Sequence, residues 1–297
     1  MTDVYVVGAL HLDVIVSAER LPKPDETLMG EGVAYRFGGK GGNQALAAAR
    51  MGASVAMAGR VGRDDFAETI LNTLRKSGVD HTGVLQVPGA TGMSVAIIQD
   101  DGEYGAVVVS GVNQTINSAD INIDGARIVL LQNEIPNCIN ESILRAKPPQ
   151  TRIILNAAPA RASSREFLAQ VDVLVANRLE AAQLTGDSCT EGSLEDSARA
   201  LLALGPKAVV VTAGKSGAVL LEAGNMTWIY PPVQSFGSAH GAGDSFVGAL
   251  AAELALGANL KEAAQFASIA AAHFVQVPPA DRNRITKHAV VSWRSQL

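Results

Sequence analysis

The residues with the clearest capacity for chemistry stand in the turn Gly241-Ala-Gly-Asp244, directly before an apolar stretch. Helical spacing of Phe246, Leu250 and Leu254 predicts that a helix begins at this turn. The free amides of a helix's first turn carry the positive end of its dipole and can bind a phosphate. A carboxylate there is favoured in its ionised form, so Asp244 could accept a proton beside a transferring phosphoryl group. The alternative is a simple helix cap, which would not require glycine on both sides of Ala242.

A second glycine-rich turn lies in FGGKGGNQALAAARMG, residues 37–52. Its glycines, Gly38, Gly39, Gly41 and Gly42, could let the backbone approach a ligand. Lys40 could meet an anion or a hydroxyl group, and Asn43 offers both a donor and an acceptor. Gln44 stands where a dinucleotide-binding fingerprint needs its third glycine, so that fingerprint is excluded. The alternative is a strand-to-helix turn whose helix packs closely through its alanines.

The segment TAGKSG, Thr212–Gly217, superficially resembles a phosphate-binding loop. That motif requires a glycine at position 209, where this chain has Val209 within an apolar run. We therefore interpret the segment as a glycine turn after a strand. Such a turn lies at the carboxyl edge of the sheet, where open α/β sheets bind ligands.

The elements that position these turns alternate between strand and helix patterns. The expected strands are 4–8, 54–59, 128–131, 153–156, 173–176 and 208–212, and the expected helices are 43–51, 64–77, 137–146, 179–184 and 194–204. Several strands are continuous β-branched runs, which is typical of strands covered on both faces. The alternation predicts a mainly parallel sheet with helices on both sides.

Two stretches, at about 12–37 and 91–110, contain strand patterns without a helix between them. A hairpin with its turn at Asp100, Asp101 and Gly102 is predicted by the sequence TGMSVAIIQDDGEYGAVVV. The two stretches could pair as a small sheet that projects from a single domain spanning 1–297. Such a sheet suits a lid over a cleft, and an ordinary edge hairpin is the alternative.

Composition narrows the possible functions. The chain has 297 residues, 18% of them charged, a net charge of -5 and no basic cluster. Nucleic acids and anionic membranes are therefore unexpected partners. The two cysteines, Cys138 and Cys189, lack metal-ligand spacing, which favours free thiols in a reducing compartment. The N-terminus lacks the pattern of a signal peptide and no apolar run has the length of a membrane span, so we expect a cytoplasmic protein.

Taken together, the two glycine motifs resemble those of the ribokinase-like family of carbohydrate kinases. The paired signature is GGKGGNQALAAAR at 38–50 and GAGDSFVGAL at 241–250. Further matches are LLQNE at 130–134, LNAAPA at 155–160, NRLEAAQLTG at 177–186 and VTAGKSG at 211–217. The resemblance extends from about Val4 to about Ala272. It implies a three-layer α/β/α fold with a mainly parallel central sheet and a small β-sheet lid.

The resemblance implies an ATP-dependent kinase that transfers the γ-phosphoryl group to a hydroxyl of a small sugar, with ribose as the first expectation. It makes Asp244 the base, and the amides of Gly241, Ala242 and Gly243 the anion hole. The residues it assigns to the sugar are His11, Asp13, Gly39, Lys40, Gly41, Gly42, Asn43 and Glu134. Those it assigns to ATP are Asn177, Thr212, Ala213, Gly214, Lys215, Ser216, Gly217, Gly243 and Ser268, and Glu180 would order Mg²⁺ through water.

The chain departs from the family's pattern in three places. Ser238 and Ala239 replace the usual Asp-Thr, whose Asp helps to bind an activating potassium ion, and VQVPPADRNRIT at 275–286 replaces a glycine-containing loop. Both departures argue against potassium activation. His11 replaces the usual Asn of the sugar site, which keeps a nucleoside, a ketohexose or a sugar acid open as substrate. A catalytically silent sugar- or nucleotide-binding protein is the remaining alternative. The family's lids pair between subunits, so a homodimer is expected.

Overall fold

The computed structural model describes residues 2–99, 104–186, 193–232 and 239–296. The predicted hairpin turn at 100–102, Cys189 and Ser238 lie outside these ranges.

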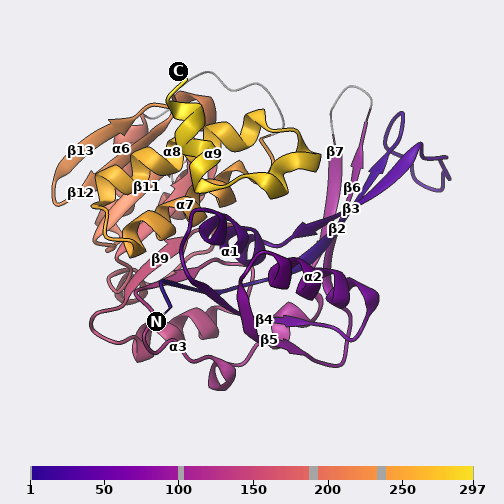
Figure 1. The fold of residues 1–297 in the computed structure, drawn as a ribbon, viewed down its shortest axis with the longest axis horizontal. Helices are drawn as coiled ribbons and strands as arrows, with labels where there is room; N and C mark the ends of the chain where they lie inside the picture. Colours follow the sequence, from indigo (N-terminus) through magenta and orange to yellow (C-terminus); the bar gives the residue numbers. More distant parts are fainter. Residues whose placement is uncertain (1, 100–103, 187–192, 233–238, 297) are drawn as a thin grey trace.

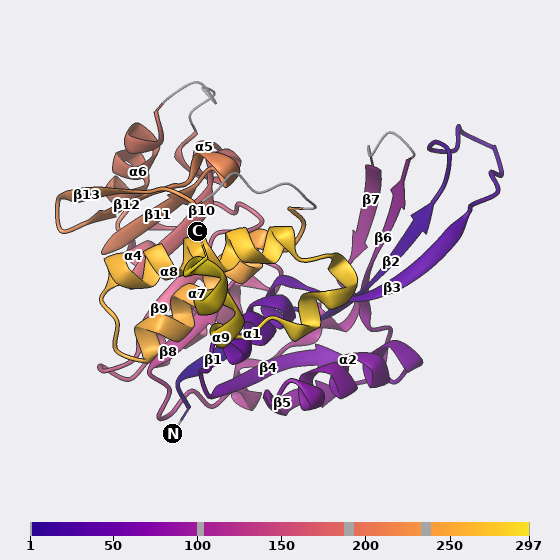
Figure 2. The ribbon, with the colours of Figure 1, turned by 45° about the horizontal axis from the view of Figure 1, so that its top comes forward.

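A large sheet runs through the centre of the molecule (Figures 1 and 2). Its strands are β1 (Val4–Val7), β4 (Val55–Val61), β5 (Asp80–Gln86), β8 (Ile128–Leu131), β9 (Arg152–Asn156), β10 (Val173–Asn177), β11 (Ala208–Thr212), β12 (Ala218–Glu222) and β13 (Asn225–Ile229). In the described chain their order is β13-β12-β11-β10-β9-β8-β1-β4-β5. Every pairing from β11 to β5 is parallel, and β12 and β13 add antiparallel pairings at one edge.

Helices cover both faces of this sheet. One layer contains α1 (Lys40–Arg50), α2 (Asp65–Lys76), α7 (Ala242–Ala255), α8 (Leu260–Gln276) and α9 (Lys287–Arg294), and the other contains α3 (Asn137–Ala146), α4 (Arg165–Leu168), α5 (Arg178–Thr185) and α6 (Leu194–Ala203). Successive strand residues point to opposite faces. Leu130 of β8 accordingly packs in the core with α7, whereas Val129 and Leu131 pack in the core with α3. The predicted three-layer α/β/α fold is confirmed.

A small four-stranded sheet stands away from the main body (Figures 1 and 2). It is formed by β2 (His11–Ser17), β3 (Gly32–Gly38), β6 (Gly92–Ile98) and β7 (Tyr104–Val109), in the order β3-β2-β6-β7. The pairs β2–β3 and β6–β7 are antiparallel, and β2–β6 is parallel. Both stretches that break the alternation of strands and helices therefore pair with each other, as expected. Only three residues separate β1 from β2, so this sheet is anchored at the carboxyl end of β1.

Four short 3₁₀ helices occur in the described chain: η1 (Gly111–Thr115), η2 (Ser118–Asp120), η3 (Gly214–Ser216) and η4 (Pro279–Arg284). No helix in the described ranges combines the length and the hydrophobicity needed to cross a bilayer.

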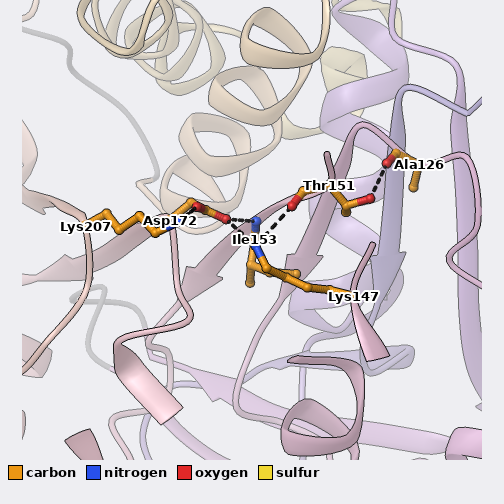
Figure 3. A network of polar contacts seen from close by, with 6 residues as sticks. All are labelled: Ala126, Lys147, Thr151, Ile153, Asp172 and Lys207. Atoms are coloured by element: carbon orange, nitrogen blue, oxygen red, sulfur yellow. Dashed lines mark hydrogen bonds and ion pairs between the residues drawn. The ribbon is translucent and has the colours of Figure 1, made fainter. Parts of the chain in front are cut away.

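Asp172 ties together the amino ends of the parallel strands, at the edge away from the glycine turns (Figure 3). Its carboxylate accepts hydrogen bonds from Lys207 at 2.6 Å, from Lys147 at 3.1 Å and from the amide of Ile153 at 2.7 Å. Burial opposes its ionisation, but these donors outweigh burial and hold the pKa of Asp172 below its usual value. The carboxylate thus links the starts of β9, β10 and β11.

Candidate active site

Two adjoining pockets open at the carboxyl ends of the parallel strands. The polar pocket, of about 180 Å³, is lined by Lys40, Asn156, Asn177, Glu180, Thr212, His240, Gly241, Gly243 and Asp244, among others. The second pocket, of about 370 Å³, is mainly apolar. Thr212, Gly243 and Phe246 line both pockets, so the pockets meet at the start of α7. This edge is where open α/β sheets bind their ligands, as we expected for the turn after β11.

Asp244 lies in the first turn of α7, and amide side chains from α1 hold its carboxylate. Gln44 Nε2 donates to Asp244 Oδ1 at 2.9 Å, and Asn43 Nδ2 donates to Oδ2 at 3.2 Å. The buried Gln132 Nε2 in turn donates to Gln44 Oε1 at 2.8 Å. Each carboxylate oxygen therefore accepts one side-chain hydrogen bond. The side chain is oriented by residues about 200 positions away, not by its own helix.

Burial raises the pKa of Asp244 above its usual value. The charge of Lys40 and the hydrogen bonds from Gln44 and Asn43 act in the opposite direction. A carboxyl group with a raised pKa is a stronger base than an exposed one. The arrangement suits proton abstraction from a hydroxyl group.

The turn before α7 presents backbone amides to the cleft. Gly241 has φ 83°, a left-handed conformation that favours glycine, and a Cβ added there would lie 3.3 Å from the Phe274 ring. Gly243 is exposed, and a side chain added there would meet no atom within 4 Å, so a ligand can approach its amide closely. The Ala242 amide, in contrast, donates to the Ala239 carbonyl at 3.0 Å. The Ala242 amide, one of the three predicted for the anion hole, is thus already engaged within the turn.

Helices α1 and α7 are in close contact just behind the carboxylate. A Cβ at Gly248 would lie 2.5 Å from the Cβ of Ala47 and 2.6 Å from the carbonyl oxygen of Gln44. Only glycine fits at this position, and its absence of a side chain brings α7 close enough for the Gln44–Asp244 hydrogen bond.

Lys40 and Glu134 lie beside Asp244. The Lys40 amide donates to Glu134 Oε2 at 2.8 Å, which joins the start of α1 to the segment after β8. Burial raises the pKa of Glu134 to about 7, although the charge and the amide of Lys40 oppose the shift. Burial disfavours the charge of Lys40, but the nearby carboxylates of Asp244, Glu134, Glu180 and Asp13 leave its pKa raised. Lys40 is thus a cation held among four acidic side chains.

Asp13 projects from β2 of the small sheet toward the same region. Its Oδ1 accepts a hydrogen bond from Ser94 Oγ of β6 at 2.6 Å. A Cβ at Gly38 would lie 2.3 Å from the Asp13 carboxylate, so that glycine leaves room for the carboxylate. The position of Asp13 therefore depends on three strands of the small sheet.

His11 is buried at the start of β2. Burial lowers its pKa, the charge of Lys40 lowers it further, and Asp13 opposes these effects, so the ring is neutral at pH 7. Its Nε2 has no hydrogen-bond partner among the described residues. A buried polar atom without a partner is costly, and a ligand hydroxyl group could satisfy it.

Three glycines of the first motif contact protein and not open space. Gly39 has φ 83° and approaches the Ala9 carbonyl, Gly41 lies against the backbone of Gly8, and Gly42 lies against Phe37 and Leu10. These contacts favour the close-packed strand-to-helix turn for the glycine positions. The polar residues between and after them, Lys40 and Asn43, face the site. Helix α1 begins at Lys40, three residues before the predicted start, because the turn at Gly39 already directs the chain into the helix.

The mainly apolar pocket contains most of the residues predicted to bind ATP. Its lining includes Thr212, Gly214, Lys215, Gly217, Gly243 and Ser268, together with Pro231, Ala271, Ala272 and Val275. The predicted residues Ala213 and Ser216 are not part of this lining. Gly217 has φ 96°, and a Cβ there would lie 2.3 Å from the Ile229 carbonyl, so glycine is required where β12 begins.

Asn177 and Glu180 form a reciprocal cap at the start of α5. Asn177 Oδ1 accepts from the Glu180 amide, and Glu180 Oε2 accepts from the Asn177 amide, each at 2.8 Å. Burial raises the pKa of Glu180, while the Asn177 amide and Lys40 oppose the shift. Both residues line the polar pocket opposite Asp244. The cap therefore fixes the Glu180 carboxylate at the polar pocket.

Sequence reasoning missed Gln44, Gln132 and Ser94. Gln44 was considered only as a missing glycine, although a polar residue within the alanine-rich face of a helix is a signal of a buried hydrogen bond. Gln132 lies within the LLQNE match at the end of an apolar strand, a comparable signal. Ser94 carries no such signal, because its role follows only from the register of β2 and β6.

Comparison with known proteins shows similarity along the whole chain. The pfkB family of carbohydrate kinases matches residues 1–286. Ribokinase from Bacillus subtilis (strain 168) is 35% identical over 279 residues, which cover 91% of this chain and 92% of the relative. Ribokinase from Mus musculus is 34% identical over 268 residues, which cover 86% of this chain and 83% of the relative.

Solved structures show the same relationship. Ribokinase from Thermotoga maritima is 28% identical and superposes with a TM-score of 0.90, with 100% of both chains covered. The Arabidopsis thaliana ribokinase complexed with ribose and ATP is 31% identical and superposes with a TM-score of 0.89, with 99% of this chain and 98% of that chain covered.

Proposed function

Because this chain belongs to the pfkB family of carbohydrate kinases, we propose that it transfers the γ-phosphoryl group of ATP to a hydroxyl group of ribose. The observation that carries this proposal is the position of Asp244. Its carboxylate stands at the amino end of α7, held by Asn43 and Gln44, where the polar pocket meets the side chains predicted to bind the sugar. Relatives called ribokinase at 34–35% identity favour ribose over other sugars.

In the proposed reaction Asp244 accepts the proton of the sugar hydroxyl as that oxygen bonds to the γ-phosphorus. The bond from this phosphorus to the oxygen shared with the β-phosphate breaks, and ADP leaves. The amides of Gly241 and Gly243 would stabilise the charge on the transferred group. Lys40 would balance the negative charge that phosphates add to a site already rich in carboxylates. The protein's main task is to align and stabilise the reacting groups.

Asp13, Glu134, Asn43 and Lys40 are the proposed sugar-binding groups. Carboxylate and amide oxygens can each accept hydrogen bonds from hydroxyl groups, and the four residues come from the small sheet, the segment after β8 and the start of α1. His11 would donate or accept one further bond through its unpartnered Nε2. Closure of the small sheet over the cleft would exclude water from the reaction.

The apolar pocket is the proposed site of the adenosine part of ATP, since Ser268 and the alanines of α8 offer a flat wall. Lys215 and the turn Gly214–Gly217 would contact the ribose and phosphates of the nucleotide. We propose that the protein acts in the cytoplasm, where ATP is available.

The polar pocket offers oxygen ligands suited to Mg²⁺. Mg²⁺ keeps several waters and needs only one or two carboxylates besides the phosphates of its substrate. The half-buried Glu180 carboxylate, with one oxygen engaged by the Asn177 amide, fits that requirement. No group of three His, Cys, Asp or Glu side chains in the described ranges could hold a metal alone. Mg²⁺ bound here would neutralise phosphate charge, and Glu180 would orient its waters.

We expect no potassium requirement. Ala239 is exposed and has no carboxylate to offer, and the segment that replaces the family's glycine-containing loop forms η4, with a buried arginine at position 282.

A homodimer is proposed to form through the small sheet. The strand register places Val33, Tyr35, Val95, Val107 and Val109 on one face, and all five are exposed. An exposed apolar face on a projecting sheet is typical of an interface. Asp13 and Ser94 lie on the opposite face, so a second copy would cover the apolar face and leave the substrate side free.

Replacement of Asp244 by Asn tests the proposed function. The substitution keeps the shape of the side chain but removes the base, so kcat should fall by ~10²–10⁴. ADP release should be measured with ATP and Mg²⁺ across ribose, deoxyribose, fructose, tagatose, ribonucleosides and sugar acids. The matched control is Asp64→Asn, which alters a carboxylate that caps α2 outside the site. Near-normal turnover in Asp244→Asn would exclude the assigned base, and turnover on another substrate alone would exclude ribose.

A further inference from the structure

The guanidinium group of Arg282 lies directly behind the turn that precedes α7. Its Nη1 donates to the carbonyl oxygen of His240 at 3.1 Å, and its Nε donates to the carbonyl oxygen of Val277 at 3.1 Å. The residue is 9% exposed, which is unusual for arginine. One side chain therefore connects η4, the end of α8 and the residue before Gly241.

Phe274 of α8 completes this arrangement. The Arg282 Cζ atom lies 4.2 Å from the centroid of the Phe274 ring, within the range of a cation–π interaction. Phe274 also lies close to Gly241, since a Cβ added at Gly241 would lie 3.3 Å from the same ring. Phe274 thus packs against both the guanidinium and the turn. Neither group can shift without disturbing the other.

The contact to His240 determines where the next amide points. A peptide bond is planar, and in a trans peptide the carbonyl and the N–H point in opposite directions. The only cis peptide among the described residues joins Ala158 and Pro159, so the His240–Gly241 peptide is trans. Because Arg282 holds the His240 carbonyl on the protein side, the Gly241 amide is directed away from Arg282, toward the cleft.

The surroundings keep Arg282 charged. Burial, and to a lesser extent the charge of Arg36, lower its pKa, but a guanidinium does not lose its proton in proteins. Val277 ends α8, and the negative end of a helix dipole favours a cation there. The positive charge therefore remains behind amides that face a transferring anion.

We propose that Arg282 is a positioning residue for phosphoryl transfer: it fixes the peptide before α7 and supplies a permanent positive charge behind the anion hole. The inference rests on the proposed kinase activity and adds to it a residue that contacts neither substrate. Its role concerns the transition state, in which charge on the transferred group must be met by aligned amides. It should affect kcat more than the binding of ATP or sugar.

The test uses two variants of Arg282. Arg282→Met keeps an unbranched side chain against Phe274 but removes the hydrogen-bond donors and the charge. Arg282→Lys keeps the charge but lacks the planar guanidinium group. Loss of a hydrogen bond from a charged group typically lowers a rate by about 10–100-fold. We expect that loss in kcat for Arg282→Met, little change in either KM, and a smaller loss for Arg282→Lys. Free guanidinium ion below denaturing concentrations should restore part of the activity of Arg282→Met. Arg284→Met, two residues on and exposed, is the matched control and should behave like the wild type.

A second measurement separates alignment from general destabilisation. The affinity for ADP alone should be compared with that for ADP, aluminium fluoride and ribose together, which mimic the transition state. We expect Arg282→Met to weaken the second complex by the same factor as kcat and to leave the first unchanged. Equal weakening of both complexes, or an unchanged kcat in a folded variant, would overturn the inference while leaving the kinase assignment intact. A wild-type protein that phosphorylates no sugar would instead refute the proposed function.

Discussion

Gln44 provides a sharp test of how the fold prepares Asp244. Gln44→Leu keeps the approximate volume of the side chain but removes its hydrogen bond to Asp244 Oδ1. That bond stabilises the charged form of the carboxylate, whose pKa is already raised by burial. Its removal must therefore raise the pKa further. The enzyme would need a higher pH to ionise its base.

The size of the pKa shift of Asp244 follows from the strength of a hydrogen bond to a charged group. A hydrogen bond to a charged group contributes about 1.5–3 kcal/mol, and one pKa unit corresponds to about 1.4 kcal/mol. The pKa of Asp244 should rise by about one to two units. At pH values low enough that the base is mostly protonated, kcat of Gln44→Leu should be about 10–100-fold below that of the wild type, since a smaller fraction of molecules then carries the ionised base. At high pH the variant should approach the wild-type rate.

The same substitution should destabilise the fold for a separate reason. Gln132 Nε2 loses its acceptor inside the core, which costs about 1–3 kcal/mol. Replacing both partners by apolar groups can be nearly neutral, so Gln44→Leu/Gln132→Leu should recover stability without recovering the pH profile. The two effects can thus be separated within one double-mutant cycle.

The assay is the pH dependence of kcat with saturating ATP and ribose, together with urea unfolding of the single and double variants. The reasoning predicts an acidic limb displaced to higher pH in both variants that lack Gln44. A limb that coincides with that of the wild type in folded Gln44→Leu would refute it, because the hydrogen bond would then contribute nothing to the ionisation of Asp244.

Three further predictions concern other parts of the molecule. Asp172→Asn should lower the free energy of unfolding by about 1–3 kcal/mol at neutral pH. Because the pKa of Asp172 is lowered in the folded protein, this difference should shrink as the pH falls through that pKa. Urea titrations at several pH values check it. Val107→Asp should produce monomers in sedimentation experiments, whereas Val108→Asp, on the opposite face of β7, should leave the dimer intact; monomeric wild-type protein would refute the proposed interface. Exchange of potassium for tetramethylammonium should leave kcat unchanged, and a dependence of kcat on potassium would refute the expectation that none is required.

The fold was largely predictable because the strands carry strong local signals. The strands β8, β9, β10 and β11 are short, continuous apolar runs, and each was placed to within a residue at either end. The edge strand β5 was missed, since its sequence DHTGVLQ mixes polar residues and glycine without alternation. No boundary was predicted for α8, whose alanine-rich sequence has a weak apolar stripe. Local patterns therefore revealed the buried centre of the sheet better than its periphery.

The site was only partly predictable from the residues themselves. Asp244 could be singled out from its own turn, but spacing along the chain says nothing about Asn43 or Gln44 as its partners. Family resemblance supplied the sugar and nucleotide residues, whose positions in the structure agree with a common cleft. Arg282 was visible only as part of a departure from the family's pattern. Its contacts are with backbone carbonyls, which no side-chain motif encodes.

The bond between Gln44 and Asp244 also sets the order of events when the chain is made. At ~5–20 residues per second, about 10–40 s pass between synthesis of these two residues, which are 200 positions apart. During that interval the face of α1 that contains Gln44 and Ala47 has no α7 to cover it, and the Gln44 amide has no carboxylate to bind. The site around Asp244 is therefore completed only after the strands of the central sheet have been made. A nascent or truncated chain that ends before residue 241 can contain most of the sheet but lacks Asp244.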